Sequence, residues 1–107
     1  IIILTTCPSM EIAKNLSTSL VTKKLAACVS IIPKVLSIFF WNGKIVEDTE
    51  ALMVMKTTQL MAKNVINFIK TSHPYDVPEV LTLAIKDGNS EYMKWIHDSV
   101  EMKSPKN

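Results

Sequence analysis

The stretch CVSIIPKVLSIFFW, residues 28–41, is followed by Asn42-Gly43 and then by KIVEDTEALMVMK, residues 44–56, and together these segments decide the fold. β-Branched and aromatic residues dominate the first segment, which is typical of a β-strand. Asn-Gly is the strongest short-range signal for a two-residue hairpin turn. The sequence therefore predicts that the two segments pair as one long β-hairpin. Pro33 has no N–H, so we expect the first strand to bend there and to lie at a sheet margin.

The predicted hairpin is longer than a single domain of this size can cover. An extended strand over residues 28–41 would span about 46 Å, against about 17–20 Å for a common strand. Its far end carries four large apolar side chains, Ile38, Phe39, Phe40 and Trp41. Leaving such side chains in water forgoes about 1.5–3 kcal/mol each. We therefore expect another copy of the chain to cover this end.

The N-terminal part of the chain predicts a strand and a helix. IIILTTC, residues 1–7, is a β-branched run that we expect to form a strand buried on both faces. After it, apolar residues recur at every fourth position from Ile12 to Leu20. This spacing is that of one helical stripe, and it predicts a helix over residues 9–26.

The later segments complete an alternating pattern. We predict a helix from Thr57 or Thr58 to near Ser72, a strand over residues 79–86, and a last helix capped by Asn89 or Ser90. This order predicts an α+β domain with the ferredoxin-like βαββαβ arrangement and a C-terminal helix. We expect one domain over residues 1–102 and a frayed tail over residues 103–107. Helices on one face leave the other face of the sheet bare, which again predicts a partner.

Composition argues against several function classes. The chain has 107 residues, enough for one hydrophobic core, and all 12 basic residues are lysine. Arginine supplies the planar fork that reads guanine and clamps phosphate, so its absence argues against sequence-specific nucleic-acid recognition. No apolar run approaches the roughly 18 residues of a membrane span. Gly43 and Gly88 are the only glycines, so the sequence has no glycine-rich phosphate loop.

Cysteine usage bears on the compartment. Cys7 and Cys28 are too few for the disulfide framework of a small secreted domain, so we expect a cytoplasmic protein. The chain begins at Ile1, inside an apolar run, and we expect that an upstream segment has been removed.

One loop carries the strongest signal for a site. HPYDVPEV, residues 73–80, spaces His73, Asp76 and Glu79 at intervals of three. Imidazole and carboxylates in a proline-stiffened loop can ligate divalent ions, and intrinsic affinity favours copper. Cys7 can join this set if the first and fourth strands are adjacent, and its thiolate would make the site softer. The alternative is a helix-to-strand corner that the prolines fix and the polar side chains cap.

Two further groups leave alternatives open. Glu47, Asp48 and Glu50 indicate either oxygen ligands for a hard cation or charges that protect an exposed strand from edge-to-edge pairing. Cys28 indicates a packed small side chain or, if it meets His73 in space, the nucleophile pair of an enzyme. We favour the packed cysteine and expect no enzyme.

Five motifs, in order, resemble those of the CutA divalent-cation-tolerance family: LAACVSIIP, WNGKI, LMVMKT, HPYDVPEV and DGNSEYMKWI. The resemblance covers nearly the whole chain. It implies a ferredoxin-like subunit, a homotrimer whose long hairpins wrap neighbouring subunits, and an architecture similar to the trimeric PII signalling proteins. It also implies a role linked to copper, as Cu(II), or to another divalent metal ion.

The resemblance also implies a set of metal groups: a first-strand cysteine, a histidine at the start of the loop and the glutamate after the second proline. Glu79 matches directly. Thr5 and Ser72 hold the positions where the family has its cysteine and where its histidine can lie. Cys7 and His73 are therefore the nearest residues of the same chemistry.

The PII-like architecture implies a second hypothesis. It is a signalling or scaffold trimer that binds a small molecule or a protein in clefts between subunits. The residues that we expect at such a cleft are Cys28, Trp41, Lys56, Tyr75 and Asp76.

Overall fold

The computed structural model describes residues 1–100. In chain order the elements are β1 (Ile2–Cys7), α1 (Met10–Thr22), β2 (Cys28–Trp41), β3 (Lys44–Lys56), a 3₁₀ turn (Gln59–Met61), α2 (Ala62–Ser72), β4 (Leu81–Leu83) and α3 (Ser90–Ser99). The predicted tail over residues 103–107, and the last two residues of the predicted domain, lie outside the described residues. No helix within residues 1–100 is long and apolar enough to cross a membrane.

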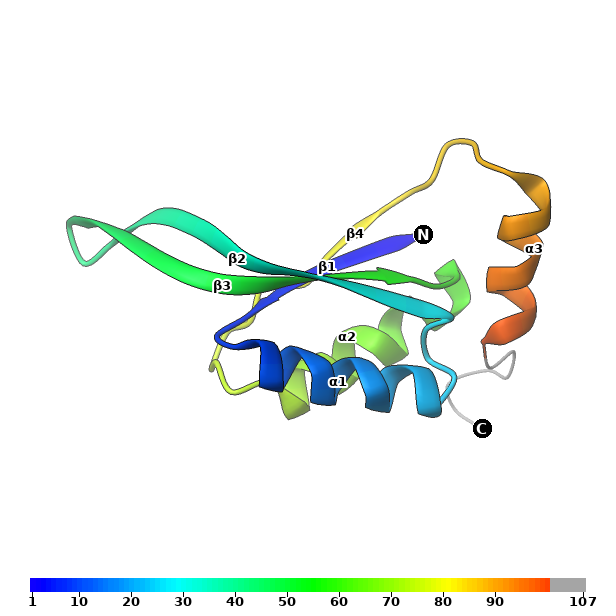
Figure 1. Cartoon of the computed structure of the whole chain (residues 1–107), viewed down its shortest axis with the longest axis horizontal. Coiled ribbons are helices and arrows are strands. Elements are labelled where there is room, and N and C mark those ends of the chain that lie inside the picture. The colour runs from blue at the N-terminus through cyan, green and yellow to red at the C-terminus, as the bar shows by residue number, and fades with distance from the viewer. Residues whose placement is uncertain (101–107) are drawn as a thin grey trace.

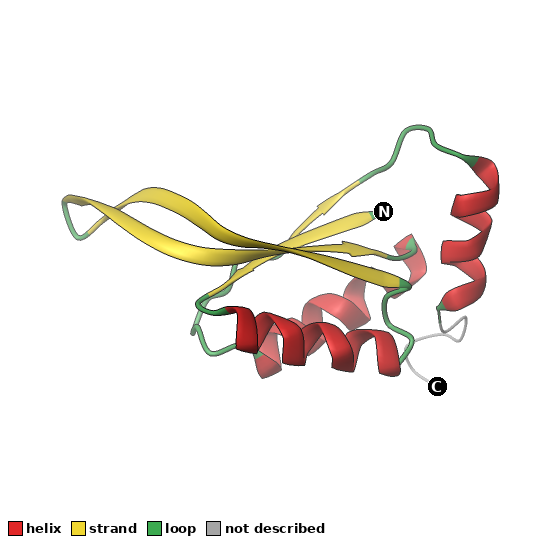
Figure 2. Cartoon of the chain, viewed as in Figure 1, coloured by secondary structure: helices red, strands yellow, loops and turns green. Residues whose placement is uncertain are grey.

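The four strands form one antiparallel sheet in the order β2-β3-β1-β4. Helices α1 and α2 lie against one face of this sheet, and α3 lies near one of its ends (Figures 1 and 2). This confirms the predicted α+β, ferredoxin-like domain. It also confirms that the first and fourth strands are adjacent, which brings the end of the HPYDVPEV loop beside β1.

The hydrophobic core lies between the sheet and the helices. Alternation along β1 turns Ile3 and Cys7 toward α1 and α2, and both are fully buried together with Met53 and Met55 of β3. From the helix side, Leu20 of α1 completes this layer. On the opposite face of β1, Ile2 and Leu4 are half-buried rather than buried, because no helix covers that face of the sheet.

The hairpin of β2 and β3 has the predicted turn and bend. Asn42 and Gly43 both have positive φ, 50° and 77°, as a two-residue hairpin turn of this hand requires. The strand register shifts between Ile32 and Val35, and Lys34 adopts a positive φ of 57° at this bulge. As predicted, β2 is an edge strand. Figure 1 shows the hairpin projecting well beyond the helices, with its turn at the far end of the molecule.

Two helix boundaries differ from the prediction. Helix α1 ends at Thr22 rather than near Ala26, because Lys24 takes a left-handed φ of 60° and the Leu25 N–H turns back to the Leu20 carbonyl. The chain then reaches β2 without further helix. The second helix begins with the 3₁₀ turn after Thr58, whose hydroxyl makes no capping hydrogen bond, so α2 itself starts at Ala62.

The fourth strand is shorter than predicted, Leu81–Leu83 rather than residues 79–86. Only the first half of β1 offers it a pairing edge, from Ile2 to Leu4. Glu79 is instead tied to the sheet through its carbonyl, which accepts a hydrogen bond from the Thr5 hydroxyl. The last helix begins as predicted, and the Asn89 side chain caps it.

Candidate metal and ligand sites

His73 is a buried residue at the end of α2, with 7% of its surface exposed. Its Nε2 lies 2.7 Å from the Thr6 carbonyl oxygen, and its Nδ1 accepts a 3.1 Å hydrogen bond from the Tyr75 N–H. A carbonyl can only accept, so Nε2 carries the proton and the ring is the neutral tautomer. Both ring nitrogens are thereby used within the chain. A metal ion could bind here only by displacing one of these contacts.

Cys7 is fully buried at the end of β1. Its Sγ lies 3.4 Å from the Met53 Sδ. Burial, and then the charge of Glu50, raise the pKa of the Cys7 thiol to about 11. With this pKa the thiol of Cys7 stays protonated at neutral pH, whereas metal ligation requires the thiolate.

The third predicted ligand, Glu79, has an exposed side chain. Within residues 1–100 no three His, Cys, Asp or Glu side chains are placed to hold a metal ion together. The predicted set of His73, Glu79 and Cys7 thus occurs as a buried neutral ring, a surface carboxylate and a buried thiol. These donors do not fit a preformed copper site within one chain.

A pocket of about 600 Å³ lies between the hairpin tip and the loop after α2. It brings together three of the five predicted cleft residues, Trp41, Tyr75 and Asp76. Its other lining residues are Phe39, Val46 and Val77. The sequence did not single them out for the cleft, because apolar and aromatic residues at a hairpin tip are more often part of an interface or a core.

Tyr75 lines this pocket, and its side chain is restrained by contacts on two sides. Its hydroxyl donates a 2.9 Å hydrogen bond to Glu50 Oε2, and its ring lies 4.7 Å from the His73 ring, tilted by 51°. Burial, followed by this hydrogen bond and the charges of Glu50 and Asp48, raise the pKa of Tyr75 to about 12. The phenol is therefore neutral at physiological pH, and its ring is held in place.

Glu50 has a different setting from the one that the sequence predicted. It was expected to be one of three surface carboxylates on the hairpin, yet only 8% of its surface is exposed. The contact between Glu50 and Tyr75 could not be predicted from the sequence, because the loop after α2 meets β3 only in the folded chain.

The other two predicted cleft residues, Cys28 and Lys56, form a separate group. They are opposite each other on β2 and β3. The Lys56 Nζ lies 3.8 Å from the Cys28 Sγ and donates a 2.6 Å hydrogen bond to the Ser30 hydroxyl. Neither residue lines the pocket at the hairpin tip. Cys28 therefore lies beside Lys56, whereas the ring of His73, its partner in the hypothetical nucleophile pair, is hydrogen-bonded to the Thr6 carbonyl.

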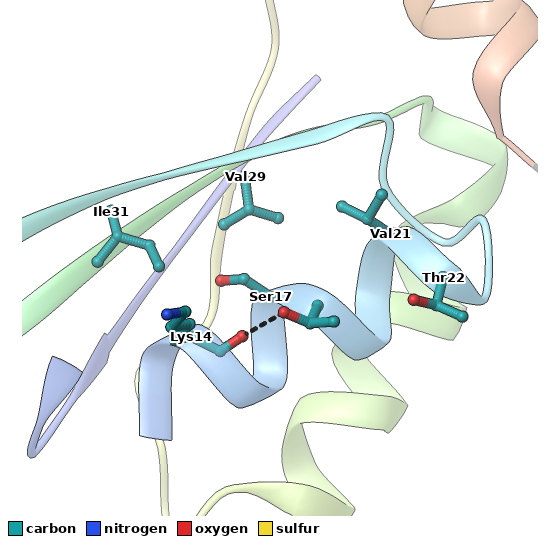
Figure 3. A pocket seen from close by; sticks show the side chains of 7 residues that line it. Lys14, Ser17, Val21, Thr22, Val29 and Ile31 are labelled. Atoms are coloured by element: carbon teal, nitrogen blue, oxygen red, sulfur yellow. Dashed lines mark hydrogen bonds between the residues drawn. The ribbon is translucent and has the colours of Figure 1, made fainter. Parts of the chain in front are cut away.

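A second hollow, of about 360 Å³, lies between α1 and the edge strand β2 (Figure 3). Val21, Val29 and Ile31 give it apolar walls, and Lys14 lies at one end. The Ser17 hydroxyl is buried beside it and has no hydrogen-bond partner among the described residues. The hollow is open and mainly apolar.

Comparison with known proteins decides the family. The family model described as CutA1 divalent ion tolerance protein matches residues 1–99. The chain belongs to this family. Among CutA1 relatives, the Thermus thermophilus divalent-cation tolerance protein CutA is 42% identical over 98 residues, which cover 92% of this chain and 95% of that protein. The mouse Protein CutA is 43% identical over 96 residues, which cover 90% of this chain.

Solved CutA1 structures agree with the fold. CutA1 from Oryza sativa has a TM-score of 0.94 at 39% identity, with 96% of this chain and 94% of that chain covered. The divalent cation tolerance protein from Thermus thermophilus has a TM-score of 0.90 at 41% identity, with 94% and 97% covered. The chain spans 54% of the length of the mouse CutA and 63% of that of the Xenopus laevis homologue.

Proposed function

We propose that this chain serves in the response to divalent cations as a homotrimer without catalytic activity. The observation that carries the proposal is the overhanging hairpin. Ile38, Phe40 and Ile45 share one face of it, because residues two apart point the same way and Phe40 pairs with Ile45. Each is more than 60% exposed in the single chain. Burying them on sister subunits would gain about 1.5–3 kcal/mol per side chain.

Membership of the CutA1 family supports the metal role in general terms. We do not assign Cu(II) to a site within one chain, because no three ligating side chains come together within residues 1–100 and both nitrogens of His73 are engaged. Binding of Cu(II) or another divalent ion through His73, Glu79 and Cys7 remains a prediction for titration. So does the cytoplasmic location, since the relatives include a chloroplastic and a periplasmic protein by name.

Size-resolved light scattering tests the assembly. We expect a mass three times the 12.0 kDa of one chain. A monomer at micromolar concentration would contradict the trimer.

Calorimetric titration with Cu(II) and with Zn(II) tests the ligands. The variants are His73→Gln and Glu79→Gln, and the matched controls are His97→Gln and Glu11→Gln, whose side chains are exposed on other elements. Loss of heat in the first pair alone would support the predicted ligands. Isotherms identical to wild type in all four variants would remove His73 and Glu79 from any metal site.

The pocket at the hairpin tip favours a second candidate function, the binding of a small molecule as in a PII-like signalling trimer. It gathers Trp41, Tyr75 and Asp76 around a volume large enough for a metabolite. A ligand of this kind would raise the melting temperature by mass action, whereas metal ions would not act at this site. A screen of charged and neutral metabolites, read as melting-temperature shifts, tests it.

A further inference from the structure

We propose that the pocket at the hairpin tip binds an organic cation, a small molecule with an alkylated ammonium group. The inference rests on the second candidate function and names its ligand class. Three aromatic side chains, Phe39, Trp41 and Tyr75, and one carboxylate, Asp76, line a single pocket of about 600 Å³. Nothing in the proposal requires a metal ion.

The walls of the pocket suit a diffuse positive charge. Phe39 and Trp41 lie two apart on β2 and point to one face of the hairpin, and Val46 is opposite Phe39 on β3. Tyr75 comes from the loop after α2. Aromatic faces attract ammonium groups through the negative face of the ring, and tryptophan does so best. Several rings around one pocket form the kind of cage that recognises quaternary ammonium groups.

The charge on the pocket wall is negative. Among the described residues, Asp76 is the only charged one that lines the pocket. Behind Tyr75 lie the carboxylates of Glu50 and Asp48, both close enough to act on its phenol. Lys44, opposite Trp41 at the exposed tip, is the cation on the neighbouring strand and does not line the pocket. This field attracts cations and repels anions.

The same residues exclude the other charged ligands. A hard metal ion needs several oxygen ligands, and the pocket offers one carboxylate. A phosphate or carboxylate ligand would face Asp76 with no basic partner in the lining. An alkylammonium ion needs only one counter-charge and close apolar contact, and the pocket provides both.

The Tyr75 ring is fixed before any ligand arrives. Its hydroxyl is bound to Glu50, and its backbone N–H is bound to His73, which is itself held by the Thr6 carbonyl. A ring that is already ordered loses little entropy when a ligand binds.

The proposed ligand site and the proposed subunit contact use different faces of the hairpin. Phe39 and Trp41 point to the pocket, whereas Ile38, Phe40 and Ile45 point to the other face. A trimer formed through that other face leaves the pocket available.

Two probes of equal shape test the charge requirement. Choline carries a trimethylammonium group, and 3,3-dimethylbutan-1-ol is its neutral carbon counterpart. Titration calorimetry of the full chain at low ionic strength, with sodium chloride as the blank, gives both affinities. We expect choline to bind at least about tenfold more tightly than the alcohol. Equal affinities would overturn the cation inference and leave the pocket as an apolar ligand site. Binding of neither probe would overturn it as well.

Matched variants locate the binding. Trp41→Ala is expected to weaken choline binding about tenfold, and Asp76→Asn about fivefold. The controls Trp95→Ala and Asp98→Asn change the same residue types on α3, at the opposite end of the molecule (Figure 1), and are expected to leave choline binding unchanged. Removing the nearby positive charge with Lys44→Gln is expected to strengthen choline binding about twofold.

Equal losses in the α3 variants and the pocket variants would overturn the assignment to this pocket. If Trp41→Ala does not fold, Asp76→Asn and the probe pair still decide. Light scattering and metal titration of the wild-type protein are independent of choline binding. A negative choline result would therefore not contradict the proposed trimer or the proposed metal role.

Discussion

The Tyr75 hydroxyl donates a 2.9 Å hydrogen bond to Oε2 of Glu50, a carboxylate with only 8% of its surface exposed. This contact joins the loop after α2 to the middle of the long hairpin strand β3, 25 residues away in sequence. Tyr75 also lies beside the buried His73 ring and lines the pocket at the hairpin tip, so this hydrogen bond restrains a side chain that both share.

The Glu50→Gln substitution should lower the pKa of Tyr75 from about 12 toward the ordinary 10.0. Burial is the largest cause of the raised pKa and remains, so we expect a partial fall. The tyrosinate absorbance during a pH titration measures it, with Tyr75→Phe to identify the signal and Glu47→Gln, exposed on the same strand, as control. An unchanged titration in Glu50→Gln would contradict the role of this carboxylate.

The raised pKa of Tyr75 also predicts how stability depends on pH. In the unfolded chain the phenol loses its proton near 10.0, but in the folded chain it does so only at about 12. The folded state therefore binds more protons in that interval, and the free energy of unfolding falls as pH rises through it. Urea unfolding at several pH values measures the slope, which Tyr75→Phe should reduce.

The two cysteines should differ in reactivity. Cys7 is fully buried and burial, with the charge of Glu50, raises its pKa to about 11, so alkylation of the native protein near pH 8 should spare it. Cys28 is only half-buried beside Lys56 and should be labelled first. Mass spectrometry after timed alkylation separates the two, and both should react in denaturant. Equal native rates would contradict the buried, protonated Cys7.

Local sequence signals predicted the hairpin turn and the cap of α3, because these depend on residues that are close together in the chain. The sheet order followed instead from the ferredoxin-like order of the elements. Asn42-Gly43 fixes the turn through positive φ values, and Asn89 caps α3 through its own side chain. The early end of α1 was not predictable, since Lys24 gives no sign that it will adopt a left-handed conformation.

The site was predicted less well because it depends on contacts between distant segments. The sequence placed His73, Tyr75 and Asp76 in one stiff loop but gave no means of telling that the His73 ring would turn inward to the Thr6 carbonyl. The spacing of His73, Asp76 and Glu79 is compatible with a metal site and also with a helix-to-strand corner, and it does not distinguish the two. The hydrogen bond from Tyr75 to Glu50 was not predictable either, because it forms only where the loop packs against β3.

Lys34 holds a φ of 57° at the bulge of β2, a conformation that costs an L-residue about 1–2 kcal/mol. Lys34→Gly should therefore raise the free energy of unfolding by up to about 1 kcal/mol, after the greater entropy of glycine in the unfolded chain is subtracted. Lys14→Gly, in the interior of α1, should lower it by about 1 kcal/mol. Chemical denaturation measures both, and destabilisation by Lys34→Gly would contradict the strain.

The Phe40→Ser substitution separates assembly from ligand binding. Phe40 is 68% exposed in the single chain and lies on the hairpin face that we assign to the subunit contact. Losing its burial should weaken association by about 1.5–3 kcal/mol per interface, which is at least about tenfold. Light scattering over a range of concentrations should show dissociation, with Met10→Ser, an exposed apolar residue on α1, as control.

If Phe40→Ser keeps the wild-type mass at every concentration, that face of the hairpin does not hold the trimer together. If the variant dissociates as expected, choline binding should persist in the free subunit, because one chain supplies Trp41, Tyr75 and Asp76 and Phe40 does not line the pocket. Loss of choline binding together with the trimer would instead mean that a neighbouring subunit completes the pocket.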